Sequence, residues 1–192
     1  MNLPNKLTLL RILLVPVFLV CMYVNFPFHY TASLIVFAIA SITDPLDGNI
    51  ARKYNLVTTF GKFADPLADK VLVLAAMAAL ADTDNVPVNG IVVTIIAARE
   101  FMVSGLRLVT AEKGVVVAAG IWGKLKTAFT MVAIVVILII EMVLVDFGVA
   151  CDGGTMTVLN IGMTALVWIS VLLTIISGAV YLKGYSSYID MK

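Results

Sequence analysis

The chain has 192 residues, of which 61% are hydrophobic and only 13% are charged. A soluble domain carries about 25% charged residues, so this composition favours an integral membrane protein. Thirteen Lys and Arg residues against twelve Asp and Glu residues leave a formal net charge of +1, and this balance argues against a nucleic-acid partner. The two cysteines, Cys21 and Cys151, make neither a disulfide framework nor a CxxC site.

Six apolar segments are long enough to cross a bilayer, which takes about 20 mostly apolar residues as a helix. They cover residues 7–26, 30–52, 60–81, 90–110, 122–145 and 158–183. No internal repeat or linker marks a second domain. The sequence therefore predicts an all-α integral membrane protein with six transmembrane helices, in one domain that covers residues 1–192.

The positive charges predict how these helices are oriented. Lys and Arg flank the first helix, the second and fourth connectors and the C-terminus, whereas the connectors at the opposite end carry none. Cytoplasmic connectors carry the excess of Lys and Arg in membrane proteins. We therefore expect both termini, and a polar intramembrane cavity at this end of the helices, to face the cytoplasm.

Polar side chains recur at the start of the first predicted helix. Asn5, Thr8 and Arg11 are spaced three residues apart and so share one face of a helix. One interpretation is a short interfacial helix whose cation reaches the membrane surface. The other places these residues at the rim of the cavity, as part of a site for the phosphate of an acceptor.

Four aspartates interrupt the second and third apolar segments. Asp44 and Asp47 are i,i+3 neighbours, and Asp65 and Asp69 are i,i+4 neighbours, so each pair points to one side of its helix. If the two helices are antiparallel, four carboxylates converge on a small volume. Bare charges at membrane depth repel each other and are costly to desolvate, and hard divalent cations such as Mg²⁺, Mn²⁺ or Ca²⁺ remove that cost.

Two glycines accompany the aspartates. Gly48 follows Asp47 directly, and Gly61 lies one turn before Asp65. A surface without side chains lets a flat ligand group approach the backbone. Close packing of helices through small residues is the competing explanation.

The spacing D-x2-D-G-x2-A-R-x8-G-x3-D-x3-D, which starts at Asp44 and ends at Asp69, resembles the signature of the CDP-alcohol phosphatidyltransferases. The resemblance implies an integral membrane enzyme in which an alcohol displaces CMP at the phosphorus of CDP-diacylglycerol. It implies that Gly48, Ala51, Arg52 and Gly61 bind the CDP-diacylglycerol.

The resemblance also assigns roles to the carboxylates. Asp44, Asp47 and Asp65 become the main ligands of two divalent metal ions, Mg²⁺ or Mn²⁺. Asp69 becomes a weakly coordinated ligand that also takes the proton of the attacking hydroxyl group, and is therefore the catalytic residue. Positioning and neutralisation of charge carry such a displacement.

Four cations follow on the next two predicted helices: Arg99, Arg107, Lys124 and Lys126. An arginine inside a membrane segment is a functional candidate, and together the four predict an anion site beside the aspartates. We expect an ion pair between Arg99 and Glu100 to be poor, because adjacent residues on a helix do not face each other. Positive-inside topology alone is the alternative, and it explains Arg99 badly.

The last predicted helix carries no distinctive motif. Its aromatic residues, Tyr181 among them, are interpreted as interfacial or packing residues. We therefore expect no chemistry from residues 158–183.

The basic cluster favours a phosphorylated acceptor. The segments around Asn5, Arg99 and Lys124 resemble those of the bacterial phosphatidylglycerophosphate synthases, a branch of the same family. This resemblance implies sn-glycerol 3-phosphate as the acceptor, a homodimer, and a multi-pass protein of the bacterial cytoplasmic membrane with a cytoplasmic active site. The alternatives are another CDP-alcohol phosphatidyltransferase, such as one with an inositol phosphate acceptor, and an ion-coupled transporter, since buried acids also mark ion paths.

Overall fold

The computed structural model describes residues 2–53, 58–112, 114 and 120–185, without the side chains of residues 3, 4, 44–53, 59, 60, 62, 63 and 112. Over these residues the chain forms six α-helices and no strand, which confirms the predicted all-α fold. They are α1 (Leu3–Tyr23), α2 (His29–Lys53), α3 (Thr59–Ala81), α4 (Gly90–Glu112), α5 (Ile121–Glu141) and α6 (Gly153–Tyr185). A π-helical turn, η1 (Met142–Asp146), follows α5 directly.

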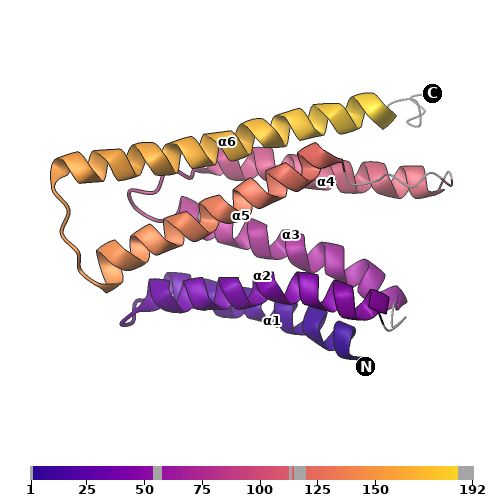
Figure 1. Cartoon of the computed structure of the whole chain (residues 1–192), viewed down its shortest axis with the longest axis horizontal. Coiled ribbons are helices and arrows are strands. Elements are labelled where there is room, and N and C mark those ends of the chain that lie inside the picture. Colours follow the sequence, from indigo (N-terminus) through magenta and orange to yellow (C-terminus); the bar gives the residue numbers. More distant parts are fainter. Residues whose placement is uncertain (1, 54–57, 113, 115–119, 186–192) are drawn as a thin grey trace.

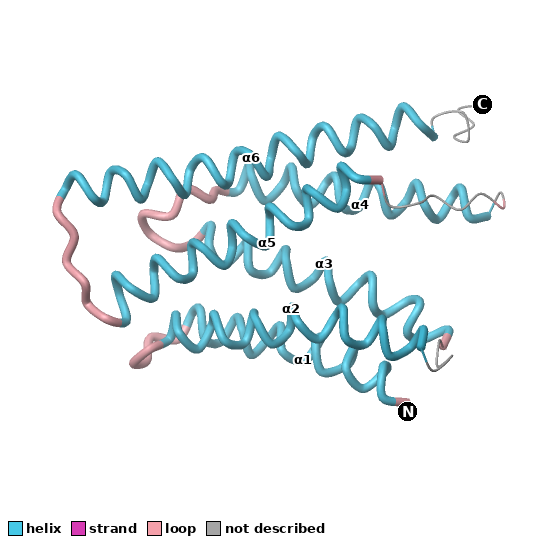
Figure 2. The backbone as a smooth tube through the Cα atoms, viewed as in Figure 1, coloured by secondary structure: helices cyan, strands magenta, loops and turns pink. Residues whose placement is uncertain are grey.

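The helices run along the long axis of the molecule and alternate in direction (Figures 1 and 2). Consequently α1 begins, and α6 ends, at the same end of the bundle, where α2 also ends and α3 begins. Helix α1 packs against α2 and α3, while α6 packs against α4 and α5. Contacts of α2 with α5, and of α3 with α4, join these two groups of three helices.

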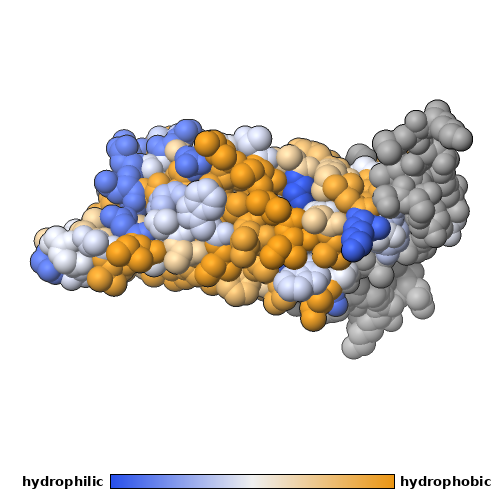
Figure 3. All heavy atoms as spheres, turned by 90° about the horizontal axis from the view of Figure 1, so that it is seen from above, coloured by the Kyte–Doolittle hydropathy of each residue, from blue (hydrophilic) through white to orange (hydrophobic). Residues whose placement is uncertain are grey.

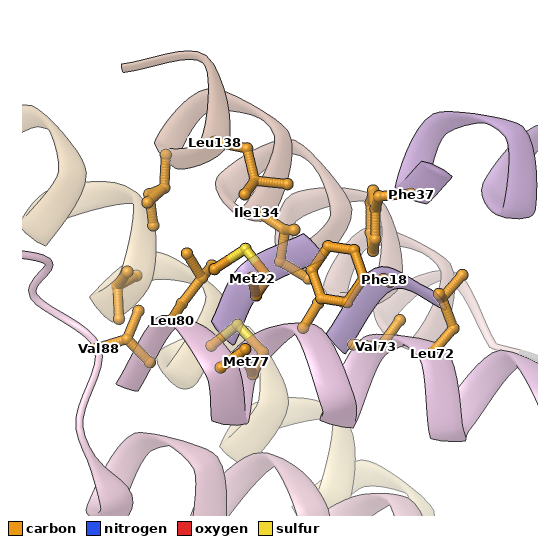
Figure 4. Close-up of a cluster of buried hydrophobic side chains, with 14 of the residues drawn as sticks. Phe18, Met22, Phe37, Leu72, Val73, Met77, Leu80, Val88, Ile134 and Leu138 are labelled. Atoms are coloured by element: carbon orange, nitrogen blue, oxygen red, sulfur yellow. The ribbon is translucent and has the colours of Figure 1, made fainter. Parts of the chain in front are cut away.

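A hydrophobic core fills the interior between the two groups (Figure 4). The rings of Phe18 on α1 and Phe37 on α2 lie 5.9 Å apart at a tilted angle, an arrangement that suits aromatic pairs. Leu72, Ile134 and Leu138 are buried around them, from α3 and α5. The core therefore holds α5 onto the first three helices.

Large apolar side chains also cover much of the exterior. Figure 3 shows one face whose middle is hydrophobic, with hydrophilic residues gathered mainly toward its ends. A soluble monomer rarely exposes an apolar surface of this extent, whereas lipid chains solvate it. Among the residues that the structure describes, three helices are long and apolar enough to cross a membrane: Asn5–Tyr23, Ile121–Asp146 and Gly153–Tyr185.

The connectors at the end opposite the aspartates are fixed by helix caps. Asp146 accepts hydrogen bonds from the backbone N–H of Thr31 at 2.6 Å and from its hydroxyl at 2.7 Å, at the start of α2. Before α6, the hydroxyl of Thr155 donates to Asp152 and lowers the pKa of that carboxyl. Such caps satisfy N–H groups that have no partner within the helix, and they start α6 earlier than residue 158, where we predicted it.

We predict that Phe37→Ala destabilises the protein and that Phe101→Ala does not. Phe37 is fully buried, whereas Phe101 on α4 is 62% exposed. Truncation of a buried Phe costs about 3–5 kcal/mol in soluble proteins, which is an upper bound here because lipid also solvates an apolar side chain. Thermal denaturation in one detergent measures both variants, and equal losses of stability would contradict the packing described.

Candidate functional site

Helix α1 contacts both aspartates of α3 directly. The hydroxyl of Thr8 donates a hydrogen bond to Asp65 Oδ1 at 2.5 Å. Nη1 of Arg11 lies 2.5 Å from Asp69 Oδ1. The side chain of Arg11 is fully buried, while 43% of the side chain of Asp69 stays exposed. The burial of Arg11 argues against a cation that reaches the membrane surface. The predicted contact of Asn5, Thr8 and Arg11 with the phosphate of an acceptor stays a prediction.

A further polar contact joins the same face of α1 to the start of α3. The hydroxyl of Thr58, the N-cap of α3, accepts from the backbone N–H of Gly61 at 3.0 Å and donates to Asn5 Oδ1 at 2.8 Å. A Cβ atom at Gly61 would lie 3.3 Å from both of those side-chain oxygens. This crowding supports tight packing as a reason for glycine there, the competing explanation raised above.

The first half of the motif lies on the last turns of α2, whose backbone is helical to Lys53. The side chains of Asp44, Asp47, Ala51 and Arg52, and the surroundings of Gly48, lie outside the described residues. Within the described set, no three His, Cys, Asp or Glu residues gather around a point that suits a metal ion.

The described half of the motif nevertheless fits a hard divalent cation. Asp65 and Asp69 supply carboxylate oxygens one helical turn apart, and such ligands suit Mg²⁺ or Mn²⁺. Thr8 and Arg11 orient the two carboxylates, as outer partners orient the ligands of metal sites.

A carboxylate on α4 holds two of the predicted phosphate-binding cations. Oε1 of Glu100 lies 2.9 Å from Nη1 of Arg99 and 2.5 Å from Nζ of Lys126 on α5. The expectation of a poor Arg99–Glu100 pair was wrong, because both side chains are long enough to bend toward one another despite adjacent backbone positions. Burial makes such pairing necessary, since an unpaired charge there is costly.

Helix α6 contributes polar contacts that sequence reasoning missed. Nη2 of Arg99 donates to the hydroxyl of Ser177 at 2.5 Å, and Nη2 of Arg107 donates to the hydroxyl of Tyr181 at 3.3 Å. The interpretation of Tyr181 as interfacial or mere packing is therefore incomplete. The i,i+4 spacing of Ser177 and Tyr181 was the available signal, since it places both on one helix face.

Two neighbouring cavities connect these residues. A cavity of about 240 Å³ is lined in part by Asp69 and Lys70 of α3, Glu100 and Arg107 of α4, and Lys126 of α5. A second, of about 510 Å³, is lined in part by Lys70, Arg99, Arg107, Lys124 and Tyr181. Lys70, Glu100 and Arg107 line both.

The structure thus gathers the predicted residues whose side chains it describes into two groups. Asn5, Thr8 and Arg11 lie against Thr58, Asp65 and Asp69, whereas the four predicted cations of α4 and α5 line the two cavities. Asp69 belongs to both groups, because it contacts Arg11 and also lines the smaller cavity.

Comparison with known proteins shows the family to which the chain belongs. A protein of Bacillus subtilis named CDP-diacylglycerol–glycerol-3-phosphate 3-phosphatidyltransferase is 42% identical, over 94% of this chain and 93% of its own length. A protein of the same name from Rickettsia typhi is 41% identical over 97% of this chain and 98% of its own length. Residues 1–176 match the family model described as CDP-alcohol phosphatidyltransferase, and the chain therefore belongs to the CDP-alcohol phosphatidyltransferase family.

Proposed function

We propose that the chain transfers the phosphatidyl group of CDP-diacylglycerol to sn-glycerol 3-phosphate, which gives phosphatidylglycerophosphate and CMP in the synthesis of anionic phospholipid. Family membership supports the reaction class, and the names of the relatives in Bacillus and Rickettsia supply the two substrates. The observation that carries the proposal is the cavity that Asp69 shares with Lys126 and Arg107. It puts a carboxylate beside cations that suit a phosphorylated alcohol.

The aspartate side of the site would hold the donor. Asp44, Asp47, Asp65 and Asp69 would hold two divalent cations, which would supply charge neutralisation for the attacking and leaving oxygens. Gly48, Ala51, Arg52 and Gly61 would contact the CMP portion. Arg11 and Thr8 would keep Asp69 and Asp65 in one orientation while the phosphorus is attacked.

One proton must leave the attacking hydroxyl group as its oxygen bonds to phosphorus and the bond to CMP breaks. Asp69 would accept it, because its side chain is partly exposed and lines the cavity that reaches the cations. A general base must lie within hydrogen-bond reach of the proton it takes, and a hydroxyl group bound against Asp69 in this cavity would meet that condition.

The cation side would hold the phosphate of the acceptor. Arg99, Arg107 and Lys124 line the larger cavity, and Lys126 lines the smaller one. The Nε of Arg99 is buried and has no hydrogen-bond partner among the described residues. Guanidinium groups bind phosphate oxygens through charge-assisted hydrogen bonds, so a phosphate in the cavity would satisfy such a donor.

The membrane arrangement is also part of the proposal. We infer six transmembrane helices in one domain of residues 1–192, with both termini and the site on the cytoplasmic side of a bacterial cytoplasmic membrane. Charged residues such as Asp69, Arg99 and Glu100 lower the mean hydropathy of α3 and α4. The pairing of Asp69 with Arg11, and of Arg99 with Glu100, would let these helices lie in the bilayer. The homodimer that the resemblance implies stays a prediction.

We predict that Asp44→Ala, Asp47→Ala and Asp65→Ala each abolish turnover. Each variant removes an oxygen ligand, so Mg²⁺ or Mn²⁺ should also raise the melting temperature less than in the unmodified protein.

Asp69→Asn should keep donor binding better than turnover, because an amide retains the shape but accepts no proton.

Asp84→Ala is the matched control, since Asp84 is an exposed acid in the connector before α4. It should leave the activity and the metal-dependent stabilisation unchanged. Full activity in EDTA-treated protein would contradict the metal proposal, and near-normal turnover by Asp69→Asn would mean that another group takes the proton.

We predict that Arg99→Gln and Lys126→Gln weaken the acceptor and spare the donor. Loss of a charge-assisted contact costs roughly 1.5–3 kcal/mol, which is about ten- to a hundredfold in affinity. Arg52→Gln should show the reverse pattern, with a raised KM for CDP-diacylglycerol. Steady-state assays with each substrate varied in turn measure both values.

Lys6→Gln serves as the control for charge, because Lys6 is an exposed cation at the start of α1. It should change neither KM. If Arg99→Gln and Lys126→Gln also leave the KM for glycerol phosphate unchanged, the cations of α4 and α5 are topology signals and do not bind the acceptor.

We predict that single cysteines at Asn55 and Val115 react with an impermeant thiol reagent only from the cytoplasmic side. Cysteines at Asp84 and Ala150 should react only from the outside. The measurement uses right-side-out and inverted vesicles, after replacement of Cys21 and Cys151 by Ser. Labelling of Asn55 from the outside would invert the proposed orientation and place the site away from cytoplasmic glycerol phosphate.

A further inference from the structure

Two arginines of the proposed acceptor site lie against one aromatic ring, that of Tyr181 on α6. The guanidinium carbons of Arg99 and Arg107 lie 5.5 Å and 5.7 Å from its centroid. Two like charges near a common point repel each other. The face of an aromatic ring attracts cations at this distance, so Tyr181 offsets part of that repulsion.

The ring is itself fixed by contacts with α5. Tyr181 is 4% exposed, and its hydroxyl accepts from the backbone N–H of Gly120, the N-cap of α5, at 2.8 Å. A Cβ atom at Gly123 would lie 3.3 Å from that hydroxyl oxygen and 3.5 Å from Nη2 of Arg99. The start of α5 is therefore shaped around the tyrosine, and the ring cannot turn away without losing these contacts.

One turn earlier on α6, Ser177 contacts the same guanidinium group of Arg99. The hydroxyl of Ser177 accepts from Arg99 at 2.5 Å. A Cβ atom at Gly178 would lie 3.4 Å from Cγ of Arg99 and 3.2 Å from Cε of Met102, so α6 approaches α4 closely. Ser177 and Tyr181 both lie beyond residue 176, where the family match ends.

We propose that Tyr181 is a positioning residue that holds Arg99 and Arg107 together as one phosphate-binding pair. The inference rests on the proposed function, because it takes the phosphate of the acceptor as the ligand of that pair. The ring attracts both guanidinium groups, the hydroxyl fixes the ring to α5, and Ser177 sets the direction of Arg99. The larger cavity, which Tyr181, Arg99 and Arg107 line together, is where the phosphate would bind.

The test compares Tyr181→Leu with Tyr181→Phe in detergent-solubilised full-length protein. Leu removes the attraction for both cations, so the KM for glycerol phosphate should rise about tenfold while the KM for CDP-diacylglycerol stays within about twofold. Phe keeps the ring and should recover most of the loss. If Phe is as impaired as Leu, the ring does not hold the arginines and the proposal fails.

Tyr30→Leu controls for a general loss of stability, because Tyr30 is also buried, at 8% exposed. It lies at the start of α2, whereas Tyr181 lies near the end of α6, and these helix ends are at opposite ends of the bundle (Figure 1). It should lower the melting temperature without changing the KM for glycerol phosphate. A matching rise of that KM in Tyr30→Leu would show that destabilisation alone explains the effect, and would overturn the proposal.

A double variant tests whether Tyr181 acts through Arg107. Once Arg107→Gln has removed the cation, adding Tyr181→Leu should raise the KM for glycerol phosphate by less than it does alone. Effects that multiply would mean that Tyr181 acts independently of Arg107, and the proposal would fail.

Inorganic phosphate gives a second readout that does not depend on turnover. It should raise the melting temperature of the unmodified protein more than that of Tyr181→Leu; equal rises would overturn the role of Tyr181. If Arg99→Gln raises the KM for glycerol phosphate and Tyr181→Leu does not, only the inference about Tyr181 is lost. If the unmodified protein does not use glycerol phosphate at all, the proposed function fails and this inference fails with it.

Discussion

The ion pair of Arg11 with Asp69 is the interaction on which the site depends. A fully buried guanidinium in an apolar bundle needs a carboxylate, because an unpaired buried charge is costly. That need fixes the register of α1 against α3, and Thr8 and Asn5 then meet Asp65 and Thr58 one and two turns away. The same constraint acts on α4, where Glu100 draws Lys126 of α5 and Arg99 to one oxygen.

The Arg11–Asp69 pair and the pairs of Glu100 lie in two different groups of three helices, which we call the carboxylate half and the cation half. The first is built on α1, α2 and α3, and the second on α4, α5 and α6. Asp69 and Lys70 line cavities together with residues of the second half, so the site forms where the two halves meet. This arrangement suits a reaction with two substrates of like charge, because each half would bind one of them and the packed core would keep them at a fixed separation.

The sequence predicted the helices and their polar faces better than it predicted the partners of each charge. Apolar length and helix spacing depend on local sequence, so the helices and the shared face of Asn5, Thr8 and Arg11 could be found. The contacts of Arg11 with Asp69, and of Arg99 with Ser177, join residues far apart in the chain, and no spacing rule reaches that far. The Arg99–Glu100 pair was misjudged because helix geometry describes Cβ directions, whereas long side chains can bend toward each other.

The burial of Arg11 also constrains the order in which the chain can assemble. Ribosomes make α1 before α3, so the arginine enters the membrane region before its carboxylate exists. Arg11 lies eight residues into α1, roughly 12 Å from its start, near enough for a long side chain to extend to the surface water. The guanidinium of Arg11 can therefore stay hydrated until α3 has entered the membrane, and be buried only then. Insertion of α3 with its aspartates is thus the step after which the N-terminal half can adopt its final packing.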